Sequence, residues 1–142
     1  MRRTLPGAFL LALLAGPAFA APLEIASAWL REPPPGSSGA AIYMELHNRG
    51  DAPVAVVGAR VESAASAAVH GHRHADGMMR MYPVPRLEIA AGASVRLEPG
   101  GYHLMVGGLA AAPRAGAVLP FCLRLEDGAE QCAEARVRAI GE

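Results

Sequence analysis

The sequence predicts an all-β domain, and two observations predict it. Short β-prone runs recur along the chain, and Gly, Pro, Asn and Asp residues punctuate them. No stretch shows a convincing amphipathic helical pattern. Regular short strands of this kind are typical of a β-sandwich or a β-barrel. The 142 residues suit one such domain with a single hydrophobic core.

The expected strands follow one another with turn residues between them. They are expected at residues 23–30, 40–47, 54–61, 86–89, 94–97, 102–106, 118–125 and 129–137. The runs at 86–89 and 94–97 are expected to pair around Ala91-Gly92, and the last two runs to form a hairpin about Asp127-Gly128. The alanine-rich segment Ala64–Val69 competes as a helical turn, although it is too short to hold a helix alone. Trp29 and Tyr43, as aromatic residues in strands, are expected in the core.

The first twenty residues have the pattern of a signal peptide. Arg2 and Arg3 supply the positive start, Ala8–Ala15 is the apolar segment, and Ala18-Phe19-Ala20 is a small-x-small cleavage site. The apolar segment is too short for a spanning helix, which needs about 20 residues. We therefore expect residues 1–20 to be a signal peptide and residues 21–142 to form one exported domain with no stable membrane insertion.

The charge composition excludes several kinds of partner. The chain carries 13 basic and 13 acidic side chains, and every basic residue is arginine. No basic surface of the kind that binds nucleic acid, and no membrane-binding patch, is indicated.

Histidine and methionine residues gather in one part of the chain. His103 and Met105 lie two apart in an expected strand, so their side chains project to the same face. Met81 and His70 can complete a set of two imidazoles and two thioethers. Thioether sulfur is a soft donor that favours Cu(I) over Zn, Mg or Ca. The set therefore predicts a copper site, against the alternative that the methionines only pack in the core.

Two further histidines stand beside this set. His70, His72 and His74 alternate, so an extended segment would place all three on one side. Several imidazoles favour Cu(II) or Zn(II) over Cu(I), and a secondary Cu(II) site or a relay is one hypothesis for His72 and His74. The alternative is that both are solvated loop residues. Met79 shares parity with Met81, whereas Met78 would face the opposite way and pack.

The order and spacing of the four residues resemble the H-x10-M-x21-H-x-M motif of the PCu(A)C family of periplasmic copper chaperones. His70, Met81, His103 and Met105 match the motif in type and in spacing. The flanking sequence matches as well, in Ala28–Arg31, Pro34–Gly36, Ala40–Met44, Met79–Met81, Pro83-Val84 and Pro99–Met105. The resemblance covers about residues 23–126 and is more specific than a single short motif.

This resemblance implies a cupredoxin-like Greek-key β-sandwich with a Cu(I) site formed by His70, Met81, His103 and Met105. It implies a non-enzymatic chaperone that delivers copper to the CuA or CuB centre of a cytochrome c oxidase subunit, often alongside Sco-type proteins. The expected protein is a periplasmic monomer that releases its metal by ligand exchange.

Cys122 and Cys132 form a separate pair. They lie symmetrically about Asp127, so the predicted hairpin would place them directly opposite, and export favours a disulfide. A redox pair and a thiolate copper site are the alternatives.

The competing interpretation of the whole chain, an electron carrier of the cupredoxin type, needs a cysteine thiolate as a copper ligand. In such carriers the cysteine, a histidine and the methionine usually share one loop, and neither cysteine here has a nearby His or Met after it.

Overall fold

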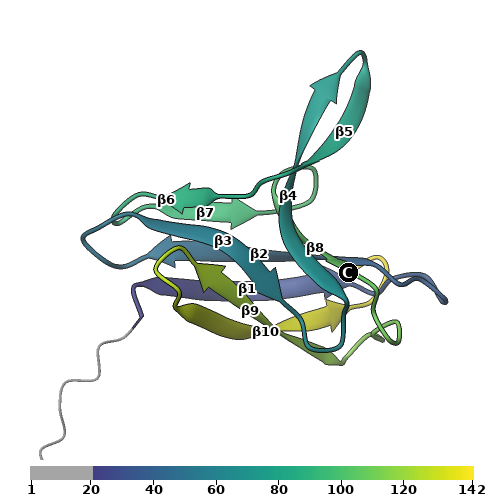
Figure 1. The fold of residues 1–142 in the computed structure, drawn as a ribbon. Coiled ribbons are helices and arrows are strands. Elements are labelled where there is room, and N and C mark those ends of the chain that lie inside the picture. The colour runs from purple at the N-terminus through teal and green to yellow at the C-terminus, as the bar shows by residue number, and fades with distance from the viewer. Residues whose placement is uncertain (1–20) are drawn as a thin grey trace, which may run out of the picture.

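The computed structural model describes residues 21–142, which form ten strands (Figure 1). The expected signal peptide, residues 1–20, lies outside the described residues. Within residues 21–142, no helix is long and apolar enough to pass through a membrane. The strands are β1 (Leu23–Arg31), β2 (Ala40–Asn48), β3 (Val54–Arg60), β4 (Ser66–Ala75), β5 (Met78–Pro83), β6 (Leu87–Ile89), β7 (Ser94–Leu97), β8 (His103–Gly107), β9 (Val118–Leu125) and β10 (Glu130–Arg138).

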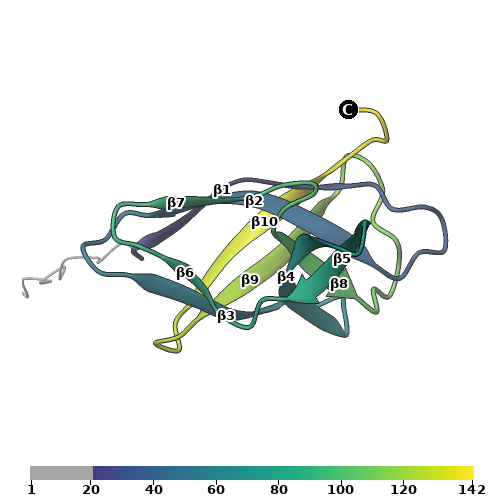
Figure 2. The same cartoon turned by 90° about the horizontal axis from the view of Figure 1, so that it is seen from above.

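The strands join into one hydrogen-bonded sheet that folds over a common core. Its strand order is β5-β4-β8-β2-β1-β10-β9-β3-β6, and β7 adds to β2. All neighbours pair antiparallel except β1 and β10, which are parallel. Figure 2 shows β1, β2 and β7 along one side of the molecule and β3 and β6 along the other. The predicted all-β class is confirmed.

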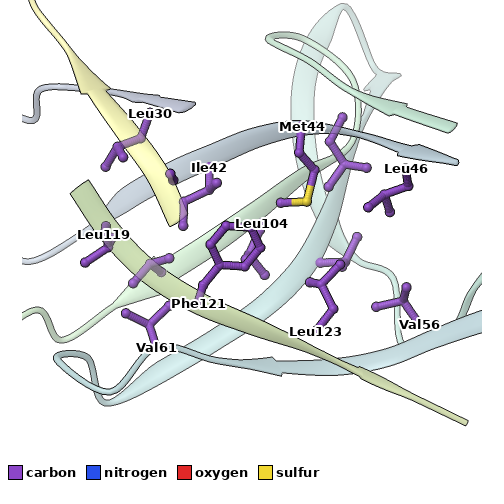
Figure 3. Packing of buried hydrophobic residues seen from close by; sticks show 14 of the residues in the cluster. Leu30, Ile42, Met44, Leu46, Val56, Val61, Leu104, Leu119, Phe121 and Leu123 are labelled. Carbon is purple, nitrogen blue, oxygen red and sulfur yellow. The ribbon is translucent and has the colours of Figure 1, made fainter. Parts of the chain in front are cut away.

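Alternating burial along the strands builds the core. In β2 every second residue is buried, which places Ile42, Met44 and Leu46 inside. They meet Leu104 of β8 and Phe121 of β9 between the two layers (Figure 3). Each fully buried side chain of this size contributes about 1.5–3 kcal/mol relative to leaving it in water. The same alternation in β8 fixes which of its residues can face outward.

Two local expectations are wrong. The runs at 86–89 and 94–97 do not pair with each other, because β6 pairs with β3 and β7 pairs with β2. The chain crosses from one layer to the other between β6 and β7, and both Leu87 and Leu97 are buried in the core. Trp29 and Tyr43 are only half-buried on the outer face, where their tilted rings lie 4.8 Å apart, centroid to centroid, and the Arg138 guanidinium lies 4.3 Å from the centre of the indole.

The alanine-rich segment is also not a helical turn. From Ser66 onward it belongs to β4, whose Val69 enters the core and whose backbone pairs with β8. β4 continues into a hairpin with β5 that rises away from the body of the sandwich (Figure 1). The loop is the two residues Asp76-Gly77, both with positive φ (53° and 72°). An Asp-Gly pair is the preferred sequence of a type I′ hairpin turn, so the sequence itself carries a signal for this hairpin.

Candidate metal centre

Strand register brings the predicted ligands to one face of β4, β5 and β8. His70 lies opposite His103 in the β4–β8 pair, and His72 lies opposite Met81 in the β4–β5 pair. Directly opposed residues of antiparallel strands share a face, and residues two apart along a strand share it as well. Met105 is therefore on this face too. We call these five side chains the His/Met face.

Met81 and His103 make the closest contact on the His/Met face. The Sδ atom of Met81 lies 3.1 Å from Nε2 of His103. The two residues differ sharply in exposure, because His103 is 3% exposed and Met81 is 50% exposed. One donor is thus held rigidly by the core while the other stands in solvent on the projecting hairpin.

A backbone carbonyl orients the His103 ring. Nδ1 of His103 lies 3.3 Å from the carbonyl oxygen of Gly101. A carbonyl oxygen can only accept, so this contact is a hydrogen bond only when Nδ1 carries the proton. Nε2 then presents a lone pair toward the Met81 sulfur. Ligating histidines typically use their second ring nitrogen in this way, which fixes the tautomer and the ring orientation.

Burial keeps His103 neutral. Desolvation is the main cause that lowers the pKa of His103 below its usual value, and nearby His72 and His70 lower it further. The hydrogen bond to Gly101 opposes these effects only in part. Since a metal binds the deprotonated nitrogen, a lowered pKa keeps Nε2 available at neutral pH.

His70 and Met105 also lie on the His/Met face, but they are less closely tied to His103 than Met81 is. The His70 ring lies 6.0 Å from the His103 ring, centroid to centroid, and its Nδ1 faces the carbonyl of Ala68 at 3.2 Å. Met105 lies opposite Ala68 in register, and its terminal methyl would come within 3.5 Å of a Cβ at Gly39. The structure therefore brings His70, Met81 and His103 together and puts Met105 on the same face. The four-ligand set itself stays a prediction.

The donor set fits a soft monovalent cation. Two donors on a tetrahedral d10 ion, with bonds of about 2.0 Å to nitrogen and 2.3 Å to sulfur, lie roughly 3.5 Å apart. The Met81–His103 contact at 3.1 Å therefore needs to open by only a few tenths of an ångström. Two lone pairs that face each other gain from a shared cation. Imidazole and thioether donors together suit Cu(I).

The two other histidines of β4, His72 and His74, differ in their exposure to solvent. His72 is half-buried in β4, its ring lies 4.9 Å from that of His103, and its Nδ1 lies 3.2 Å from the Gly101 carbonyl. His74 is exposed and lies opposite Met79 in register. His72 is therefore not a solvated loop residue. Met78 was expected to pack, and this is wrong because 56% of it is exposed.

The two cysteines are bonded to each other. Cys132 lies opposite Cys122 in the β9–β10 hairpin and forms a disulfide with it, as predicted. Glu130 lies close to both sulfur atoms, so the three residues resemble a metal cluster by distance. Because both sulfur atoms are used in the disulfide, they offer no thiolate to a metal. The expectation of a structural disulfide is confirmed.

Solved structures show which class of domain this fold defines. The structure described as "Apo PCuAC domain from PmoF1" matches with a TM-score of 0.70 and 26% identity, over 84% of this chain and 95% of that one. The structure described as "Solution structure of CuI-DR1885 from Deinococcus Radiodurans" matches with a TM-score of 0.68 and 32% identity, over 88% and 84%. The resemblance to PCu(A)C domains and the cupredoxin-like sandwich are thereby confirmed.

Sequence comparison gives the family. Residues 23–137 match the family described as "Putative lipoprotein LpqE-like", and the chain belongs to this family. A protein of Leifsonia xyli subsp. xyli, described as "Putative lipoprotein Lxx21020", is 32% identical over 107 residues. That match covers 75% of this chain and 63% of the relative, so the chain spans a little under two thirds of the relative's length.

Proposed function

We propose that this protein is a copper chaperone that binds one Cu(I) ion through His70, Met81, His103 and Met105. The observation that carries the proposal is the 3.1 Å contact between Met81 Sδ and His103 Nε2, beside the 3.3 Å contact of His103 Nδ1 with the Gly101 carbonyl oxygen. Similarity to a structure described as the Cu(I) form of DR1885, at 32% identity, supports copper as the cargo. The chain carries the ion and performs no catalysis.

The unequal exposure of the ligands suits transfer by ligand exchange. Met81 is half-exposed on the projecting β5, whereas His103 is buried at the start of β8. An acceptor's ligand can displace the Met81 thioether first, because that side chain is reached from solvent and needs no proton to leave. His103 then holds the ion until the acceptor has replaced the remaining donors.

Copper titration with a methionine variant tests the site. In the Met81→Ala, Met105→Ala double variant we expect the Cu(I) affinity to fall at least about tenfold, which is about 1.4 kcal/mol. X-ray absorption should show sulfur scattering around copper in the wild-type protein and its loss in the variant. Competition with a Cu(I) chelator gives the affinity.

Met78→Ala is the matched control for this titration. Met78 is as exposed as Met81 and lies on the same strand, but its parity places it on the opposite face. Its removal should leave Cu(I) affinity unchanged. Equal affinities for the wild-type protein and the double variant would disprove the His/Met site.

We further propose that the protein works outside the cytoplasm, in the periplasm, as a monomer. Two lipoprotein descriptions among its relatives support export. The acceptor that we propose is a copper centre of cytochrome c oxidase, reached directly or with a Sco-type protein. Mixing the Cu(I)-loaded chaperone with the apo CuA domain should move copper to that domain, and retention of all copper by the chaperone would contradict this acceptor.

The electron-carrier interpretation receives no support from the cysteines. A blue-copper site needs a cysteine thiolate among its ligands. Cys122 and Cys132 are joined in a disulfide on β9 and β10, and strands β1 and β2 separate these from β8 in the sheet order.

A further inference from the structure

His72 is prepared for a metal in the same way as the predicted histidine ligands. Its ring centroid lies 4.9 Å from that of His103, closer than the 6.0 Å that separates His70 from His103. His72 also lies directly opposite Met81 in the β4–β5 register. The position matched to the family motif is His70, yet the geometry brings His72 at least as near to the shared donors.

One carbonyl sets the tautomer of two rings. The Gly101 oxygen lies 3.2 Å from Nδ1 of His72 and 3.3 Å from Nδ1 of His103. His70 has the equivalent contact with the Ala68 carbonyl. By the donor argument made for His103, each of these contacts is a hydrogen bond when Nδ1 carries the proton, and that tautomer leaves Nε2 free. The turn that ends at Gly101 thus fixes two imidazoles with one acceptor.

His74 lies on the same strand and the same face, but its ring has no such contact with a backbone carbonyl in the described residues. Its side chain is exposed, and within residues 21–142 its ring makes no hydrogen bond. Arg73 and Arg80, the guanidinium groups nearest in the hairpin, pair with each other in register. Their parity puts them on the opposite face, away from the three imidazoles.

We propose that His72 is a copper ligand, and that His72 and His103 hold Cu(II) on the face that holds Cu(I) through its thioethers. This proposal rests on the proposed function and extends it to the oxidation state of the cargo. Imidazole nitrogen suits Cu(II), whereas thioether sulfur selects Cu(I), so a face with three imidazoles beside two thioethers can accept either ion. No electron transfer is part of the proposal.

Binding of Cu(II) alone to single-histidine variants tests it. Electron paramagnetic resonance of the wild-type protein with one equivalent of Cu(II) should show nitrogen coupling from the imidazoles of His72 and His103. In His72→Ala we expect the coupling of one nitrogen to disappear and the Cu(II) affinity to fall at least tenfold. His74→Ala, the matched control, should keep the wild-type spectrum and affinity. His72→Gln preserves a polar side chain if His72→Ala fails to fold, and it should show the same loss.

Parallel Cu(I) titrations separate this proposal from the one it rests on. If both His72 variants keep the wild-type Cu(II) spectrum and affinity, His72 is not a ligand and the inference is overturned, whatever the Cu(I) result. If the wild-type protein binds no Cu(I) but shows nitrogen coupling in its Cu(II) spectrum that His72→Ala reduces, the proposed Cu(I) function fails while the His72 assignment stands.

Discussion

His103 combines burial with an ionisable ring, and that combination governs its chemistry. A buried histidine needs partners for both nitrogens. The Gly101 carbonyl accepts from Nδ1, and the Met81 sulfur, which has no proton to donate, faces Nε2. The ring is thus oriented for a cation before any cation arrives. Such preorganisation lowers the conformational cost of binding, since the ring does not have to be ordered by the metal.

The lowered pKa of His103 predicts a pH dependence of the metal-free protein. The unfolded chain protonates this ring near pH 6.5, whereas the folded chain resists protonation to a lower pH. Between these two values the unfolded state binds more protons, so the free energy of unfolding falls as the pH is lowered through this window. His70 and His72, which face the ring, act in the same direction.

Urea unfolding between pH 8 and pH 5 measures this effect. We expect the wild-type protein to lose more stability on acidification than His103→Gln, in which the ring is absent. His74→Ala is the matched control, because it removes an exposed ring that is not among the groups acting on His103. Identical pH profiles for the wild-type protein and His103→Gln would refute the assignment.

At the scale of elements, the β4–β5 hairpin carries the site on one face and its own packing on the other. Gly71 is buried, and a Cβ there would come within 2.8 Å of the Tyr82 ring, which lies opposite it in register. Arg73 stacks over the same ring at 5.5 Å. The absence of a side chain at Gly71 therefore lets Tyr82 lie flat across the hairpin.

Gly71→Ala should weaken copper binding without touching a ligand. The added methyl forces the Tyr82 ring to shift, at a cost of about 1–3 kcal/mol if the hairpin cannot relax. We expect lower thermal stability and a severalfold lower Cu(I) affinity. Tyr82→Ala in the same chain should remove most of the added penalty, which a double-mutant cycle measures. Additive effects of the two substitutions would rule out the packing argument.

Sequence patterns predicted most elements but not this hairpin. Strands rich in branched or alternating apolar residues, such as β2 and β9, stood out, and the Cys122–Cys132 pairing followed from its turn. β4 and β5 are rich in Ala, His, Arg and Met, which are not strong strand formers, and the pairing of β4 with β8 and of β5 with β4 decides their conformation. The motif predicted the four candidate ligands, whereas the contact of the Gly101 carbonyl with two imidazoles required coordinates.

At the scale of the whole molecule, the disulfide and the proposed metal site lie in different parts of the sheet. The disulfide joins β9 and β10, which are separated from β8 by β2 and β1 in the strand order. The core runs between these regions without a break, from Leu104 beside the site to Leu123 beside Cys122. A cross-link far from the ligands can thus stabilise the fold that positions them.

Replacing both cysteines by serine should separate the two properties. A disulfide that closes a loop of this size contributes about 2–3 kcal/mol by restricting the unfolded chain. We expect the free energy of unfolding to fall by about this amount and the Cu(I) affinity to stay within about twofold. Reduction of the wild-type protein should reproduce the loss of stability. A large drop in Cu(I) affinity would show that the cysteines act on the site.

The parallel pairing of β1 with β10 has a consequence for how the chain folds. Trp29 and Leu30 pair with Arg136 and Val137, near opposite ends of the described chain. Contacts between such distant residues form slowly, because a long loop must close before they repay its entropy. A nascent chain that has not yet released its last strand cannot complete this sheet. Closure of the sheet through β10 must therefore follow the synthesis of nearly the whole described chain.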